Sequence, residues 1–277
     1  MSLFRFVSST VLFLFTGAVA LLLLGDLAYA DRHSFVETIG SPAIRQALAL
    51  SLVTSVIAAV LAVLVAVPAG YALSRYPPAG ALLLDTVVDA TIVLPPLVVG
   101  ISLLVFFRLG QDMRAAEAIP VRGLGQLICA VGERLIYTKP GIVVAQFFVC
   151  AGYAFRSVKA GFDATDRRLE TVARTLGSGP LGAFWRVAVP TAMPSIVAGA
   201  VLSWARAFGV FGPVMVFAGA VRGKTEVLPT AIYLEISIGR LEAALAIALL
   251  MIAVSFAVLV LFKRFAHTSI FGPARGP

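Results

Sequence analysis

The sequence predicts an all-α polytopic membrane protein with about six transmembrane helices. Of its 277 residues, 60% are hydrophobic, and its mean hydropathy of +0.99 is far above that of soluble domains. The apolar residues gather in six runs, and the basic residues lie mostly in the loops between them. That distribution is typical of membrane topology, so the net charge of +8 indicates membrane loops and not a nucleic-acid-binding protein.

The first run, Phe6–Leu24, follows Arg5 and is long enough to span a membrane. Ala28-Tyr29-Ala30 has the form of a signal-peptidase site, so a cleaved signal peptide is the alternative. The run is longer than the apolar core of a typical signal peptide, which favours a retained membrane anchor. We expect the next residues, Asp31–Arg45, to form a polar linker.

Five further spans are predicted: Ala47–Leu73, Leu82–Phe107, Gly141–Phe155, Ala192–Phe217 and Ala243–Phe262. The second span of the chain ends before Arg75 and Pro77, and the sixth ends before Lys263 and Arg264. The fourth span is the weakest and contains Gln146 and Gly152. The connection from the third to the fourth span has apolar residues at helical spacing, which predicts a short interfacial helix: Leu124, Leu127, Ile128, Val131 and Leu135.

Two adjacent prolines interrupt the third span. Pro95 and Pro96 remove two backbone donors, so they should kink or break the helix, and Gly100 follows them. Broken helices at membrane depth are tolerated where they are buried in protein or line a cavity, which makes these three residues candidates for lining a polar pathway. A simple kink for packing is the alternative. Asp85 and Asp89 lie one helical turn apart at the entrance of this span and therefore share one face.

A charged stretch, Arg156–Pro190, separates the fourth and fifth spans and carries six basic and three acidic residues. Four of its apolar residues recur at helical spacing, namely Leu169, Val172, Ala173 and Leu176. One face of a short helix is therefore apolar. Gly177–Pro180 should stop that helix, because Gly frees the backbone and Pro supplies no N–H donor. The stretch predicts two short helices joined by a turn.

This stretch resembles the cytoplasmic loop of ABC-importer permeases, which has the pattern E-A-A, three residues, G, nine residues, I-x-L-P. The matching positions are Val172, Ala173, Gly177, Val187 and Val189-Pro190. Thr171 stands in place of the Glu, and Glu170 is adjacent. In that family the loop is the coupling helix, which docks into a separate ATPase subunit. The resemblance thus implies that the ATPase-coupling loop contains Glu170, Thr171, Val172, Ala173, Gly177 and Pro190.

Four other segments resemble the molybdate- and sulfate-type oxyanion permeases. They are DATIVLPPLVVG (Asp89–Gly100), RGLGQLI (Arg122–Ile128), SWARAFGVFGPVMVFAG (Ser203–Gly219) and GKTEVLPTAIYLEISIGRLEAALAIALL (Gly223–Leu250). Those permeases commonly have a Glu after the A-R-A-x-G run, where this chain has Val210. The resemblance implies import of an oxyanion, molybdate or tungstate before sulfate. A permease for another small solute is the alternative within the class.

Arg206 lies in the fifth span, 16 residues beyond Pro190, or about 24 Å along a helix. A charge at that depth is expensive, so it is usually paired or directed toward a polar cavity. Arg206 is therefore either a helper for anion passage along the translocation pathway or a member of a structural ion pair with an acidic residue of another span.

The resemblance also implies an assembly. The chain would be a single permease domain, residues 1–277, with its coupling loop at about 156–190. It would not itself be an enzyme, because ATP and Mg would be bound by a partner dimer of cytoplasmic ABC ATPases. An extracytoplasmic binding protein would deliver the substrate, and a second copy of the permease would complete a homodimer. The coupling stretch and Lys263-Arg264 favour a plasma (inner) membrane protein with both termini in the cytoplasm.

Other function classes find less support in the residues. GAVRGKT, at Gly219–Thr225, differs from a phosphate-binding loop, because three and not four residues separate its glycines and no predicted strand precedes it. The two cysteines, Cys129 and Cys150, do not have the spacing of a metal site. A secondary transporter is the alternative from another class, but few ionisable residues besides Asp85, Asp89 and Arg206 lie in the spans.

Overall fold

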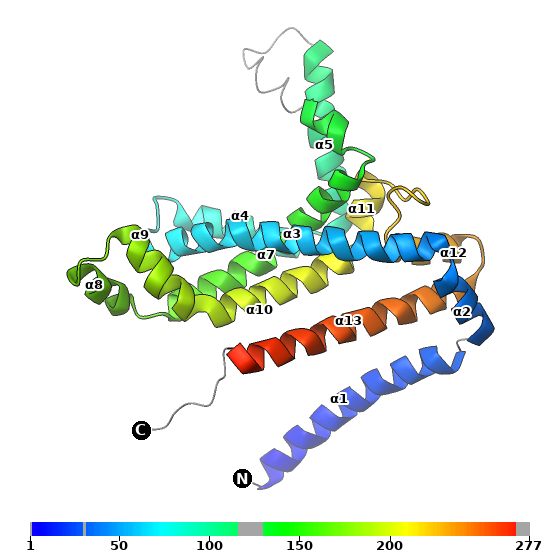
Figure 1. Cartoon of the computed structure of the whole chain (residues 1–277), viewed down its shortest axis with the longest axis horizontal. Coiled ribbons are helices and arrows are strands. Elements are labelled where there is room, and N and C mark those ends of the chain that lie inside the picture. Colours follow the sequence, from blue (N-terminus) through cyan, green and yellow to red (C-terminus); the bar gives the residue numbers. More distant parts are fainter. Residues whose placement is uncertain (1, 30–31, 116–129, 270–277) are drawn as a thin grey trace.

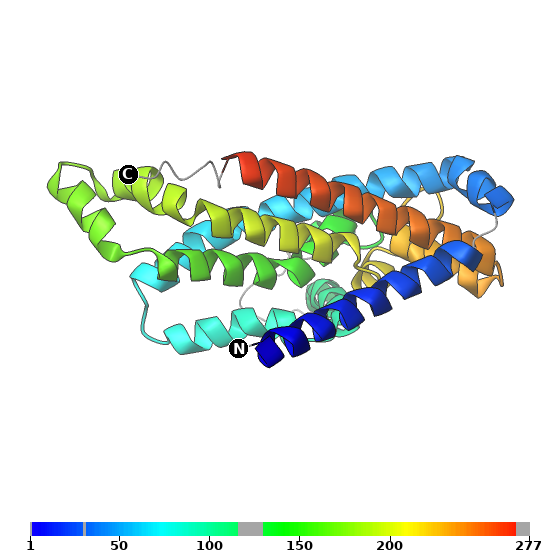
Figure 2. The ribbon, with the colours of Figure 1, turned by 90° about the horizontal axis from the view of Figure 1, so that it is seen from below.

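The computed structural model describes residues 2–29, 32–115 and 130–269, and the regular structure in this part of the chain is helical. In chain order the helices are α1 (Ser2–Tyr29), α2 (Arg32–Gly40), α3 (Pro42–Arg75), α4 (Ala81–Val93), α5 (Pro96–Ala115), α7 (Lys139–Ala164), α8 (Arg167–Thr175), α9 (Pro180–Ala183), the π-helical turn η1 (Phe184–Ala188), α10 (Val189–Phe208), α11 (Gly212–Phe217), α12 (Leu228–Ser237) and α13 (Leu241–Ser269). The long helices run roughly along one axis, and α5 stands across it (Figures 1 and 2).

Five of these helical stretches are long and apolar enough to cross a membrane, and the bent pair α4–α5 brings the number to six. The prediction of about six transmembrane helices is therefore confirmed. The first candidate span, Phe4–Leu27, contains the predicted first run, and none of its most apolar window is buried inside the chain. The polar linker predicted at Asp31–Arg45 is largely helical, because α2 occupies most of it and α3 begins at Pro42.

The centre of the structure is a bundle of α3, α7 and α10. Small side chains lie where these helices meet, among them Ala58, Ala154 and Ala192, and they allow the backbones to approach closely. The fourth span shares the lowest mean hydropathy of the five candidates with the fifth, as predicted, but α7 has 26 residues and 56% of its apolar window is buried, the highest share among the five. Its low hydropathy reflects protein neighbours on most sides, and Gln146 donates a buried hydrogen bond of 3.1 Å to the carbonyl of Ala207.

The third span is broken into two helices. The chain bends by 112° between α4 and α5, and Leu94 and Pro95 lie at the bend. The break predicted from Pro95 and Pro96 is confirmed, and α4 and α5 count as the third span only when the bent pair is taken together. Figure 1 shows the consequence: α4 lies along the bundle, where it packs on α7, while α5 turns away from it and packs on α11.

The fifth span is shorter than predicted at one end and longer at the other. α9, η1 and α10 form one stretch, Pro180–Phe208, so Pro190 lies inside the span and does not open it. The π-helical turn accommodates Pro190, because the N–H of Val189 reaches back five residues to the carbonyl of Phe184. The predicted end at Phe217 is wrong, since α10 stops at Phe208 and α11 is a separate helix.

The last part of the chain contains one unpredicted helix, α12. Its first N–H groups are held by side-chain oxygens: Val227 donates to Thr230 at 2.9 Å, and Leu228 donates to Ser51 of α3 at 2.8 Å. The sixth predicted span lies within α13. Of the predicted interfacial helix, Val131 and Leu135 lie in a helical segment at 130–135, and its first three residues lie outside the described residues.

The contact between α7 and α10 gives a test of the central bundle. A Cβ atom on Gly161 would lie 2.5 Å from the Cβ of Ser195, whereas one on Gly17 of α1 would have no neighbour within 4 Å. We expect Gly161→Ala to lower the free energy of unfolding by about 1–3 kcal/mol through overpacking, and Gly17→Ala, which gains only helix propensity, not to lower it. Thermal unfolding of both variants in detergent measures the difference, and equal melting temperatures would contradict the packing described.

Candidate functional site

The charged stretch between α7 and α10 projects from one end of the bundle as two short helices. α7 runs nine residues further than the predicted span, so Arg156–Ala164 belongs to a long helix and the projecting segment begins after it. α8, the following turn, and α9 with η1 make up this segment, residues 166–188, which we call the knob (Figure 1).

Residues at both ends of α8 explain where this helix begins and stops. At the start, the side chain of Asp166 accepts a hydrogen bond of 2.9 Å from the N–H of Arg168, which caps the helix. At the end, Gly177 has φ +93°, a left-handed conformation that favours glycine. There the N–H of Ser178 bonds to the carbonyl of Ala173 and that of Gly177 to Arg174, as in a Schellman motif. The predicted turn at Gly177 is confirmed.

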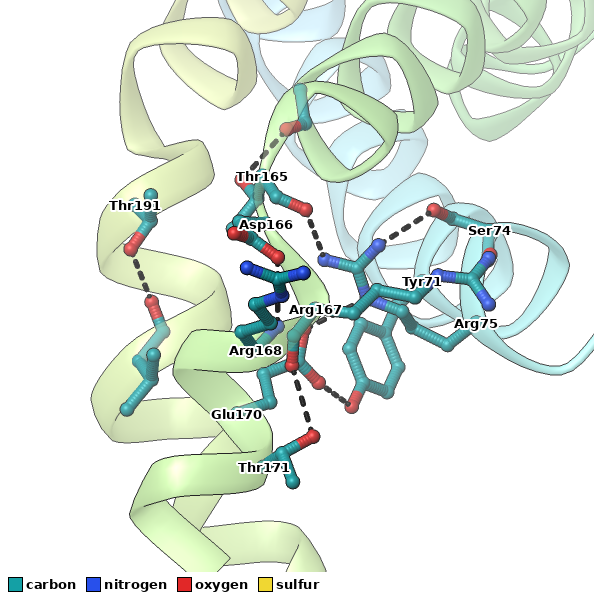
Figure 3. Close-up of polar contacts among 12 residues, drawn as sticks. Tyr71, Ser74, Arg75, Thr165, Asp166, Arg167, Arg168, Glu170, Thr171 and Thr191 are labelled. Atoms are coloured by element: carbon teal, nitrogen blue, oxygen red, sulfur yellow. Dashed lines mark hydrogen bonds and ion pairs between the residues drawn. The ribbon is translucent and has the colours of Figure 1, made fainter.

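The inner side of α8 is held by Glu170, whose side chain is only 11% exposed. Its two oxygens accept separate hydrogen bonds from α3: one of 2.7 Å from Nε of Arg75 and one of 2.7 Å from the hydroxyl of Tyr71 (Figure 3). The ring of Tyr71 packs edge-on against Phe162 of α7 and Phe184 of η1. One carboxylate therefore joins α8 to α3, at a position where α7 and η1 also meet.

Two arginines, one on α3 and one on α8, add hydrogen bonds to this junction. Arg75 also donates from Nη2 to the carbonyl of Thr165, at 3.0 Å, just beyond the end of α7. Arg167, at the start of α8, donates to the carbonyl of Ser74 in α3. These bonds satisfy carbonyl groups at helix ends that would otherwise lack intrahelical partners. We call the set Tyr71, Arg75, Thr165, Arg167 and Glu170 the clamp.

The outer side of the knob is apolar and exposed. The side chains that α8 turns away from the bundle are those of its helical apolar pattern, so the predicted apolar face exists but is not buried. Its exposed large residues, continued on α9 and η1, are Leu169, Val172, Leu176, Leu181 and Trp185. Thr171 is also exposed, Ala173 is half-buried, and basic Arg168 and Arg174 flank the apolar residues. Several large apolar side chains exposed beside basic ones are typical of a docking surface.

The predicted pathway residues do not form one cluster. Gly100 lies in a close helix crossing, because a Cβ on it would be 2.6 Å from the Cα of Pro213 in α11. Arg206 lies in the last turn of α10, and its guanidinium carbon is 5.7 Å from the ring centre of Tyr153 on α7. Its side chain is exposed, and the ion pairs found among the described residues do not include it.

A second ion-pair cluster joins α4 to α7. Arg156 donates to both carboxylate oxygens of Asp89, and its Nη1 is 3.4 Å from an oxygen of Asp85. The prediction that the two aspartates share one face is confirmed, and that face is directed at α7. The spacing of the two aspartates indicated their common face. It did not indicate their partner, because Arg156 lies 67 residues after Asp89.

Comparisons with known proteins show the family of the chain. Residues 62–268 match the protein family described as "Binding-protein-dependent transport system inner membrane component". The chain belongs to this family. It is 34% identical to the molybdenum transport system permease protein of Mycobacterium bovis, over 91% of this chain and 90% of the relative. It is 35% identical to the molybdate/tungstate transport system permease protein of Pyrococcus abyssi, over 68% of this chain and 66% of the relative.

The fold also matches that of solved ABC transporters. A crystal structure of a bacterial alginate ABC transporter, in complex with a periplasmic protein that holds an alginate pentasaccharide, aligns with a TM-score of 0.71. The alignment covers 95% of this chain and 93% of that one, at 16% sequence identity. At this level of identity the likeness shows the fold alone, that of an ABC-transporter permease.

The clamp yields a prediction for the local stability of the knob. Arg75→Met removes the cation beside a nearly buried carboxylate, which should destabilise the docking of α8 by about 3–5 kcal/mol. We expect faster hydrogen–deuterium exchange of the amides in residues 167–175. Arg168→Met removes the same charge from an exposed position on α8 and serves as the control. Equal exchange in the two variants would show that the clamp does not hold the knob.

Proposed function

We propose that the chain is the membrane-spanning permease subunit of an ATP-driven ABC importer for an oxyanion, with molybdate or tungstate as the substrate. The choice of substrate rests on the 34% identity, over nine-tenths of both chains, to a molybdenum transport permease. A second relative is named for molybdate and tungstate together. Sulfate is the second candidate, because it is also a tetrahedral oxyanion.

The knob is the proposed coupling element. Its exposed apolar side chains, with Arg168 and Arg174 beside them, suit a groove on a cytoplasmic ATPase, and ATP and Mg would be bound by that partner. The coupling loop contains Glu170, Thr171, Val172, Ala173, Gly177 and Pro190. Within it Glu170 faces the bundle, Thr171 and Val172 face outward, and Gly177 makes the turn. Pro190 has a different role, since it lies in the span behind the π-helical turn.

The arrangement of the helices supports an orientation. The start of α1 and the end of α13 lie toward the same end of the molecule as the knob (Figure 1). If the knob meets a cytoplasmic ATPase, both termini are on the cytoplasmic side, and the end that carries α2 and α12 faces the extracytoplasmic binding protein. A second copy of the permease would complete the pathway between two subunits.

Arg206 is the proposed contact for the anion along this pathway. It is exposed in the isolated chain and lies close to the end of α10, where a guanidinium without a nearby carboxylate in the described part of the chain can take an anion, water or another partner. Its position in the last turn of α10 also lets it interact favourably with the helix dipole. Pro95 and Pro96 set the direction of α5, and Gly100 lets α11 pack closely on it, so these three would shape the pathway and not contact the substrate.

Elemental analysis tests the substrate. Cells that lack the protein, grown in limiting molybdate, tungstate or sulfate, should lose molybdenum or tungsten selectively, and the wild-type gene should restore it. The gene for the Arg206→Gln variant should restore about tenfold less uptake than the wild-type gene, because the anion loses a charge-assisted partner. Arg206→Lys, which keeps the charge, should restore most of it. A loss confined to sulfur would replace the substrate by sulfate, and unchanged contents of all three elements would refute the proposal.

The turn of the knob gives a second test, of coupling and not of substrate. Gly177→Ala introduces a Cβ at φ +93°, which costs about 1–2 kcal/mol and should displace the outer face of α8. We expect less substrate transported per ATP hydrolysed, with normal insertion into the membrane. The control is Gly179→Ala in the same turn, because Gly179 has φ −65° and open space around its Cβ position. Normal uptake by the Gly177 variant would contradict the coupling role.

A further inference from the structure

The end of the bundle opposite the knob contains a charged cavity of about 690 Å³. α2, the start of α3, the loop before α12, α12 itself and the start of α13 enclose it, and Figure 1 shows these elements together at one end of the molecule. Six charged residues line the cavity: Glu37, Arg222, Glu226, Glu235, Arg240 and Glu242. With four glutamates and two arginines, its formal charge is −2 in a chain whose net charge is +8.

The charged side chains differ in depth. Glu37, Arg222, Arg240 and Glu242 are exposed and form the rim of the cavity, whereas Glu226 and Glu235 are buried and form its floor. The side chains of Glu226 and Glu235 are only 2% and 8% exposed. Arg222 donates to one oxygen of Glu235 and lies 3.8 Å from one oxygen of Glu226. A single guanidinium is thus shared between two buried carboxylates.

The remaining oxygen of each floor carboxylate is unsatisfied. Oε2 of Glu226 and Oε2 of Glu235 are buried, and neither has a hydrogen-bond partner among the residues that the structure describes. Burial raises the pKa of Glu226, the charge of Arg222 opposes this effect, and the charge of Glu235 adds to it. Buried acceptors without donors are costly, so this floor would be stabilised by a further cationic donor.

The size and chemistry of the cavity limit what that donor is. Its volume is much larger than a metal ion requires, and no group of three or more metal-ligating side chains was found in the described part of the chain. A lysine or arginine side chain fits better, because it is long enough to pass the rim and carries several N–H donors at its end. Since the cavity lies at the end that the proposed orientation assigns to the extracytoplasmic side, a protein docked there could supply it.

We propose that this cavity receives a lysine or arginine side chain of the extracytoplasmic binding protein, and that Glu226 and Glu235 are the residues that bind it. The inference rests on the proposed function, because it assumes that such a protein docks at this end. It adds the location of the contact and the charge of the group that makes it. The net negative charge of the cavity would favour the approach of a cation, and the floor carboxylates would hold the docked side chain.

Binding of the loaded binding protein to the permease–ATPase complex in lipid nanodiscs tests the proposal. Glu226→Gln combined with Glu235→Gln should raise the dissociation constant about tenfold or more, since a buried cationic group loses its partners. The difference between this variant and the wild type should be largest at low salt. Asp26→Asn, which removes a carboxylate near the end of α1 and outside the cavity, should bind like the wild type.

A second variant tests the proposal if the Glu226→Gln, Glu235→Gln double variant does not assemble. Thr38→Arg adds a guanidinium to the wall of the cavity without changing either carboxylate, and it should also weaken binding. Wild-type affinity in both variants would overturn the cavity proposal and leave the proposed function standing. Failure of the wild-type complex itself to bind the protein would instead refute the proposed function. Loss of binding when one basic residue of the binding protein is changed to glutamate would support the contact.

Discussion

The hydrogen-bonded ion pair between Arg75 and Glu170 is the contact on which the position of the knob depends. α8 has only nine residues and would be marginal as an isolated helix, so its position must come from tertiary contacts. Its apolar residues do not provide them, because they face outward. A carboxylate provides them instead, and it is nearly buried and bonded to both an arginine and a tyrosine of α3. Breaking such a pair is costly, which keeps α8 in one orientation.

The rest of the fold extends this rigidity toward the opposite end. α3, α7 and α10 approach closely over small side chains, so a displacement of the knob cannot be absorbed by loose packing between them. α3 runs from the clamp at Arg75 to the charged cavity, where its residue Ser51 also holds the start of α12. One helix therefore has contacts at both ends of the molecule. This geometry suits a protein in which binding at one face and ATP-driven movement at the other must influence each other.

Much of this architecture could be predicted from local sequence, and the parts that could not are those that depend on distant contacts. The apolar runs, the break at Pro95 and the turn at Gly177 follow from hydropathy and backbone chemistry, which act over a few residues. The end of α10 at Phe208 was missed because the apolar residues continue beyond it through Val210 and Phe211. Glu170 was recognised through a family pattern, but its partner Arg75 lies 95 residues earlier, and no spacing rule connects them.

The most direct test of a rigid connection between knob and bundle is a distance measured during the ATP cycle. Spin labels on cysteines introduced at Ala160 of α7 and Thr171 of α8, both exposed, report whether the two helices move together. In a background without Cys129 and Cys150, the assembled transporter would be compared with and without bound ATP. We predict the same narrow distance distribution in both states, because the clamp makes α8 part of the bundle. A shifted or broadened distribution on ATP binding would show that α8 pivots on its own and would contradict the role of the clamp in fixing the knob.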